Sequence, residues 1–258
     1  MSTRFSVSLL LVLAFSTPVF SQNPQSDPRA INLATKAITA LTSGSAISDV
    51  RLTANIEWIA GPKPEPGTGI FLAKGNSESR IDLSLNSTGK RTEIRNSFNG
   101  PAGQWINADG KSGNYASHNC WTDEVWFLPE LSSLANSSDP RFIFSYVGQE
   151  TWNGLSTQHL RVYQAQNDFK QAQQLSAMDF YLDPTSLVVL GIAYKTHPDS
   201  NMNVDLPAEI RFADFRPVHG IQVPLHVQRL QSGAVMLDIT VTGASFNTGV
   251  RDDEFLIQ

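Results

Sequence analysis

The last third of the chain, Met178–Gly243, contains MDFYLD (178–183), LVVLGIAYKT (187–196), LPAEIRFAD (206–214), IQVPLHVQRLQ (221–231) and AVMLDITVTG (234–243). Turn residues separate these runs, as at RPVHG (216–220) and Ser232-Gly233. In the third run, Ala208, Ile210 and Phe212 alternate with more polar positions, which places one face of a strand on a core. Strands with such short connections are neighbours in one antiparallel sheet. This stretch therefore predicts a large sheet with one apolar side.

An N-terminal helix is expected before the first strand. Asp27 can cap the helix and Pro28 can occupy its first position, as both residue types prefer. Apolar residues follow at helical spacing, and Gly44 is a suitable stop. The alternation in Asp49–Ala60 then predicts a strand.

Further strands are expected at 69–74, 79–86, 90–98, 104–107, 140–147 and 155–164. Gly and Asn residues separate them, with Asn153-Gly154 as the strongest hairpin turn. The run GPKPEPGTG (61–69) is expected to be a loop, and residues 167–176 a short helix or an extended segment.

The pattern changes between Ser117 and Ser138, where aromatic and aliphatic residues crowd together without period two. Pro129 and Glu130 can open a helix that continues to Ala135. We expect this segment to form a central lid helix over one face of the sheet.

Residues 1–21 form a predicted signal peptide, with Arg4 before an apolar run and small residues near Ser21. No cysteine directly follows the apolar run, so no lipobox is expected, and the mature chain has no expected transmembrane segment.

Residues 22–258 are predicted to form one domain, because no linker divides them. The single cysteine, Cys120, excludes an internal disulfide. A net charge of −5 argues against nucleic-acid binding through a basic patch.

Catalytic patterns are weak. Gly110-Lys111-Ser112 lacks the earlier glycine of a phosphate-binding loop and predicts a turn. Cys120 is close in sequence to His118 and Asp123, but no cysteine-protease motif surrounds it. The histidines lack metal-pair spacing. Asp123/Glu124 and Glu209/Arg211 are the carboxylate candidates, without a predicted cleft between them. We expect no enzyme activity, no cofactor and no metal.

The ordered motifs resemble the LolA-like lipoprotein-carrier superfamily, in an exported bacterial branch. The resemblance is carried by SRIDLSL (79–85), Gly103–Trp105, YVGQE (146–150) with Gly154, FYLDP (180–184) with Leu187, Ile210–Asp214, Gly220-Ile221, Pro224, and Phe246-Asn247 with Asp252, Asp253 and Phe255. It implies a mainly β (α+β) fold, an incomplete antiparallel barrel or curved sheet of about ten strands. This sheet would wrap around the N-terminal helix and the central lid helix. The carriers also use a closing arginine, for which Arg51, Arg80 and Arg91 are the candidates.

The resemblance implies a periplasmic or secreted binding protein with a hydrophobic cavity for a lipid or lipoprotein acyl chain. The expected cavity and lid residues are Leu52, Ile56, Trp58, Ile81, Leu83, Trp105, Trp121, Trp126, Phe142 and Phe144. One alternative is an envelope sensor or scaffold that binds a protein partner. A secreted hydrolase is the third, least supported, hypothesis.

Overall fold

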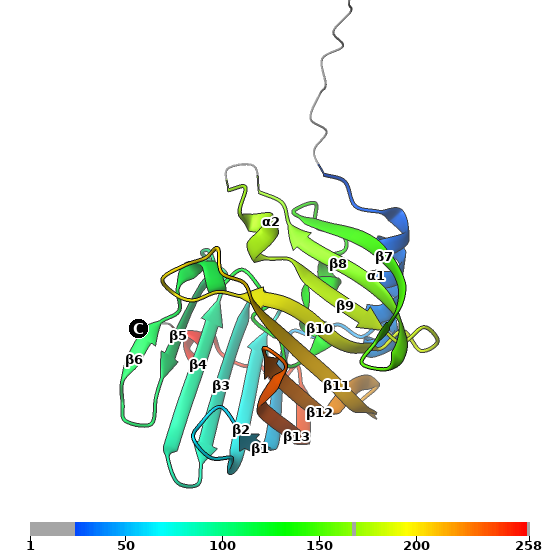
Figure 1. Ribbon diagram of the computed structural model, residues 1–258. Helices are drawn as coiled ribbons and strands as arrows, with labels where there is room; N and C mark the ends of the chain where they lie inside the picture. Colours follow the sequence, from blue (N-terminus) through cyan, green and yellow to red (C-terminus); the bar gives the residue numbers. More distant parts are fainter. Residues whose placement is uncertain (1–23, 167–168, 257–258) are drawn as a thin grey trace, which may run out of the picture.

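The computed structural model describes residues 24–166 and 169–256, and one large antiparallel sheet dominates it (Figure 1). The predicted signal peptide, residues 1–21, lies outside the described residues. The strands are β1 Asp49–Trp58, β2 Glu65–Lys74, β3 Glu78–Leu85, β4 Gly89–Asn96, β5 Ala102–Ile106, β6 Ser112–Asn114, β7 Phe142–Trp152, β8 Leu155–Gln164, β9 Met178–Leu182, β10 Val189–Thr196, β11 Leu206–Val218, β12 Ile221–Gln231 and β13 Ala234–Phe246.

The 13 strands follow the order β6-β5-β4-β3-β2-β1-β13-β12-β11-β10-β9-β8-β7. Every strand therefore pairs with its neighbour in sequence, except where β1 pairs with β13 and where the chain leaves the sheet between β6 and β7. The sheet curves but does not close, because β6 and β7 are its two edges (Figure 1). This confirms the incomplete barrel, with three more strands than the ten expected. One of them, β6, has three residues, too few for a visible period.

The hairpin turns explain why consecutive strands pair so regularly. Asn153 and Gly154 have φ values of 47° and 80°, and Ser232 and Gly233 have values of 50° and 81°. Two successive positive φ values define the tight turn whose twist matches antiparallel strands. Both predicted hairpins are confirmed. The predicted turn at 216–220 is shorter than expected, because β11 continues to Val218 and only His219-Gly220 turns.

The predicted loop at 61–69 is wrong for its second half. Glu65–Gly69 belongs to β2, which pairs with β1 and β3 on its two sides. A Cβ on Gly67 would lie 2.4 Å from the Ser84 carbonyl oxygen, and one on Gly69 would lie 2.7 Å from the Phe71 ring. These glycines therefore permit close packing within a strand, although glycine normally disfavours strands.

Two α-helices and four 3-10 helices complete the described chain: α1 Pro28–Thr42, α2 Ala172–Leu175, η1 Ser117–Asn119, η2 Pro129–Leu131, η3 Ser133–Asn136 and η4 Asp252–Phe255. Asp27 caps α1 by accepting a hydrogen bond from the Arg29 N–H at 2.8 Å, and Ser43 ends it with φ 53°. The predicted helix start is confirmed. No helix in the described part of the chain is long and apolar enough to cross a membrane.

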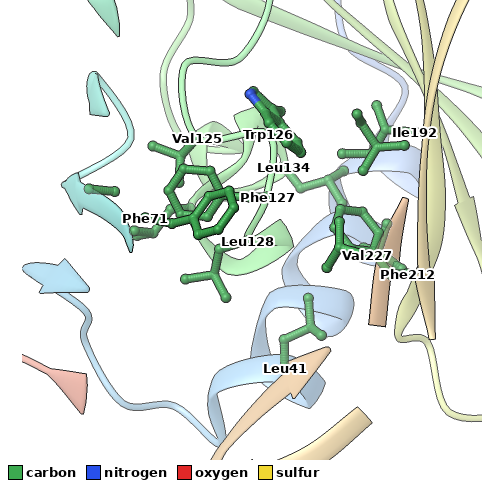
Figure 2. Close-up of a cluster of buried hydrophobic side chains, with 14 of the residues drawn as sticks. Leu41, Phe71, Val125, Trp126, Phe127, Leu128, Leu134, Ile192, Phe212 and Val227 are labelled. Carbon is green, nitrogen blue, oxygen red and sulfur yellow. The ribbon is translucent and has the colours of Figure 1, made fainter. Parts of the chain in front are cut away.

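The segment between the sheet edges, residues 115–141, is called the inserted segment here. It forms η1–η3 and turns, so the predicted helix from Pro129 to Ala135 is wrong. Every residue from Glu124 to Leu134 is buried, whereas an amphipathic helix would leave one face exposed. Figure 2 shows Trp126, Phe127 and Leu128 packed in a cluster with Phe71 of β2 and Leu41 of α1. The segment is therefore part of the core.

Candidate functional site

One wall of the candidate site is a row of residues across β3, β4 and β5. Ile81 is paired with Glu93, and Glu93 is paired with Trp105. In the next row, Leu83 is paired with Arg91. Directly paired residues point to the same side of a sheet. Apolar side chains of β3 and charged side chains of β4 therefore share the concave face.

The second wall is formed by β1, β13 and β12, where the first strand of the chain pairs with the last. Trp58 of β1 is paired with Leu237 of β13, and Leu237 is paired with Arg229 of β12. Leu237 is buried, while Trp58 remains partly exposed. The curvature of the sheet brings this wall to face the first one.

A cavity of about 260 Å³ lies between the two walls and is partly open to solvent. Trp126 of the inserted segment lines it, and Ile81, Leu83, Trp105, Met236 and Leu237 supply further apolar surface. More of its surface is apolar than polar. We call this space the apolar cavity.

An ion pair crosses the apolar cavity. Arg229 Nη1 donates to Glu93 Oε2 at 3.2 Å, and the Arg229 guanidinium lies 5.0 Å from the centre of the Trp126 ring. Burial opposes the charge of Arg229, but the carboxylate of Glu93 outweighs it, so the pKa of Arg229 is raised. Burial, followed by the charge of Glu93, also raises the pKa of the neighbouring Tyr115. Arg229 therefore stays protonated at the boundary of the cavity.

Only one of the three candidate arginines lines this cavity. Arg91 donates to Asn107 Oδ1 at 2.8 Å and lies 5.1 Å from the Trp58 ring centre. Arg51 is exposed, and Arg80 forms an ion pair with Asp82 at 2.7 Å.

The structure brings together five of the ten predicted site residues: Trp58, Ile81, Leu83, Trp105 and Trp126 line the apolar cavity. Leu52, Ile56 and Phe144 are instead buried in the hydrophobic core. Trp121 and Phe142 line a separate, mainly polar pocket of about 410 Å³ near the start of β7. Strand alternation identifies the inward face, but it does not tell which inward residues meet packing partners.

Of the charged residues that line the apolar cavity, Arg91 was a candidate from the sequence, whereas Glu93 and Arg229 were not predicted. Arg91, Glu93 and Arg95 alternate along β4, a pattern that normally marks a solvated face. Arg229 carried a detectable signal, because it continues the alternating series that includes the buried Val223 and Val227. Because burial of a charge in a packed interior is costly, an arginine on the same strand face as buried valines indicates that this face borders a cavity.

The catalytic candidates do not converge. The buried Cys120 thiol lies 3.7 Å from the Ala116 carbonyl oxygen, while His118 contacts the Pro198 carbonyl oxygen at 3.2 Å. Glu209 pairs with Arg211 beside Asn153. Among residues 24–166 and 169–256, no group of three or more His, Cys, Asp or Glu residues could hold a metal ion.

No family model and no curated protein match the sequence. Solved structures match its fold. A DUF1329 family protein from Desulfovibrio piger has a TM-score of 0.61 at 12% identity, covering 90% of this chain and 98% of its own. A LolA superfamily protein from Nitrosomonas europaea has a TM-score of 0.56 at 9% identity, covering 88% and 97%.

A third solved structure is a putative outer membrane lipoprotein-sorting protein domain from Vibrio parahaemolyticus. Its TM-score is 0.55 at 10% identity, covering 88% of this chain and 96% of that domain. The fold is LolA-like. The predicted resemblance is therefore confirmed at the level of the LolA-like fold, and the apolar cavity lies on the concave face of that fold.

Proposed function

We propose that this chain is a non-enzymatic binding protein of the cell envelope, exported by residues 1–21, that shelters a lipid or a lipoprotein acyl chain. The observation that carries this proposal is the apolar cavity on the concave face of a LolA-like fold. Its aromatic and aliphatic walls suit a hydrocarbon chain, because ligand sites are concave and mostly apolar.

The size of the cavity limits how much of a ligand it shelters. At about 30 Å³ for a water-sized group, it holds on the order of nine such groups, the scale of one medium-length acyl segment. Burial contributes about 0.8 kcal/mol for each methylene before the costs of ordering the ligand. About nine methylenes therefore contribute roughly 7 kcal/mol before those costs, less than the roughly 8 kcal/mol of a micromolar Kd, so a tightly bound ligand also needs contacts beyond the apolar walls.

Leu83→Trp tests the cavity, because the larger side chain fills it without making it polar. Leu83 is 5% exposed and lines the cavity. We expect at least a tenfold loss of affinity for a fluorescent fatty acid, measured by titration, and loss of any co-purified lipid in native mass spectrometry. Leu155→Trp, at a position 52% exposed on β8, is the matched control and should bind normally.

Equal uptake by the parent and the folded Leu83→Trp variant would place the ligand elsewhere. The same mass spectrometry separates the two main functions. A lipid mass that leaves with organic solvent supports the binding function. A lipid-free parent that takes up no fatty acid but retains one stoichiometric protein would support the envelope sensor or scaffold instead.

A further inference from the structure

A second, more polar space of about 260 Å³ adjoins the apolar cavity, and we call it the polar chamber. The two spaces share five lining residues: Trp105, Tyr115, Trp126, Arg229 and Gln231. Arg95 of β4 and Thr122 of the inserted segment lie only in the lining of the polar chamber. A molecule that extends past Arg229 and Trp126 would therefore have one end in the apolar cavity and the other end in the polar chamber.

Arg95 is the main polar group of this chamber. It is 6% exposed, and its Nη2 donates to the backbone oxygens of Asn119 at 3.2 Å and Thr122 at 3.5 Å. Its Nε has no partner among the described residues. A guanidinium carries five donors, and an unmet donor in a buried charged group is costly. The side chain is thus held in place with donor capacity to spare.

A second unmet donor lies at the junction of the two spaces. Trp126 is 2% exposed, and its Nε1 has no partner among the described residues. Figure 2 shows this nitrogen on the side of the ring away from Leu128 and Leu41. Buried indole N–H groups normally have an acceptor. Both of these groups are donors, so they require an acceptor. Glu93 Oε1 and His197 Nε2, which also belong to the linings, have no partner among the described residues either.

The neighbouring carboxyl groups leave Arg95 incompletely neutralised. Glu93 is engaged by Arg229. Burial raises the pKa of Glu124 to about 8, so this carboxyl is mainly protonated at neutral pH. Burial raises the pKa of Asp123 to about 6, and its Oδ2 accepts from the Ser133 N–H at 2.9 Å. Asp123 is therefore mainly ionised at neutral pH, and Asp199 also lines the chamber, but neither carboxylate forms an ion pair with Arg95 among the described residues. The buried guanidinium of Arg95 thus still lacks an anionic partner.

We propose that the polar chamber binds the anionic head group of a single-chain amphiphile, a carboxylate or a phosphate, while its tail occupies the apolar cavity. This inference rests on the proposed function and names its ligand class. Arg95 and Arg229 hold the oxyanion from two sides, and guanidinium groups suit carboxylate and phosphate oxygens. The indole N–H of Trp126 is a third donor at the junction.

Calorimetric titration of the delipidated protein with decanoate, decyl phosphate and decanol tests the head group at constant tail length. We expect the two anions to bind at least tenfold more tightly than decanol, the factor that one charge-assisted hydrogen bond supports. Equal affinities in the parent protein would overturn this inference and leave the proposed function intact. Binding of inorganic phosphate as tight as that of decyl phosphate would also overturn it.

Arg95→Met locates the head group. It should lower the affinity for decanoate at least tenfold and leave the affinity for decanol unchanged, whereas Arg95→Lys should restore part of the loss. Arg51→Met, the same change at an exposed position, is the control. Unchanged decanoate binding by a folded Arg95→Met protein would overturn the placement. If none of the three ligands binds the parent, the proposed function itself fails.

Discussion

At the scale of single residues, the most unusual side chain is Glu130. It lies in η2, is 2% exposed, and both its carboxyl oxygens lack a partner among the described residues. Burial raises its pKa well above the ordinary value. Between the pKa of Glu130 in the unfolded chain and its higher pKa in the folded protein, the folded protein keeps a proton that the unfolded chain has released. The free energy of unfolding therefore falls as pH rises through this interval.

Glu130→Met should remove this dependence, because an apolar side chain of similar length needs no hydrogen bond. We expect the variant to be about 1–3 kcal/mol more stable than the parent at pH 8, with a smaller gain at pH 5. Urea unfolding at the two pH values measures the difference. Glu57→Met, on the exposed side of β1, should change stability little. A Glu130→Met protein less stable than the parent at pH 8 would contradict this account.

At the scale of elements, the junction between the two halves of the sheet, where β1 pairs with β13, depends on Asp49. This residue begins β1, is 3% exposed, and accepts hydrogen bonds from the Thr248 N–H at 2.7 Å and the Gly249 N–H at 3.1 Å. Burial opposes its ionisation, but the donors of Thr248 and Gly249 outweigh burial, so the pKa of Asp49 is lowered. Its stabilisation is present above the unfolded pKa and is lost as pH falls through the folded value.

Asp49→Asn should therefore cost about 1–2 kcal/mol at pH 7, because the charge-assisted hydrogen bonds after β13 weaken. The cost should shrink toward pH 3, where the parent also loses the charge. Chemical denaturation across this pH range measures it, and the exposed Asp214→Asn is the control. A cost that stays constant from pH 7 to pH 3 would show that charge is not the cause.

At the scale of the whole molecule, the cavity exists because the interior of the curved sheet is filled unevenly. Helix α1 packs against β7, β12, η2 and η3, and the inserted segment adds buried side chains to the same core. The region between β3–β5 and β12–β13 has less packing and retains the apolar cavity. A wide sheet needs more filling than its own side chains supply.

A bound fatty acid should stabilise the whole fold through this cavity. At about 100 times its Kd it adds about 2.7 kcal/mol, which raises the Tm of a protein of this size by about 5–10 °C. Scanning calorimetry of the delipidated protein measures the shift. The Leu83→Trp protein should show no shift at the same concentration, and equal shifts in both would mean that the ligand binds outside the apolar cavity.

The strands, the hairpin turns and the start of α1 could be predicted from the sequence, because each depends on residues close in the chain. Alternation along Leu206–Asp214, the pair Asn153-Gly154 and the cap Asp27-Pro28 act within a few residues. Three of the predicted cavity residues, Trp58, Ile81 and Leu83, followed from the same alternation, which marks the inward face, whereas Trp126 was predicted from the aromatic segment that lacks this period.

Only the tertiary structure decided which of these inward positions remain open and which charges face them. Arg229 and Glu93 are 136 residues apart and meet because the sheet curves. The alternation of Arg91, Glu93 and Arg95 is the same for a solvated face as for a cavity wall. Residues 124–134 of the inserted segment show no period, because every one of them is buried. Curvature of the sheet supplies this information, since it determines the surroundings of each face.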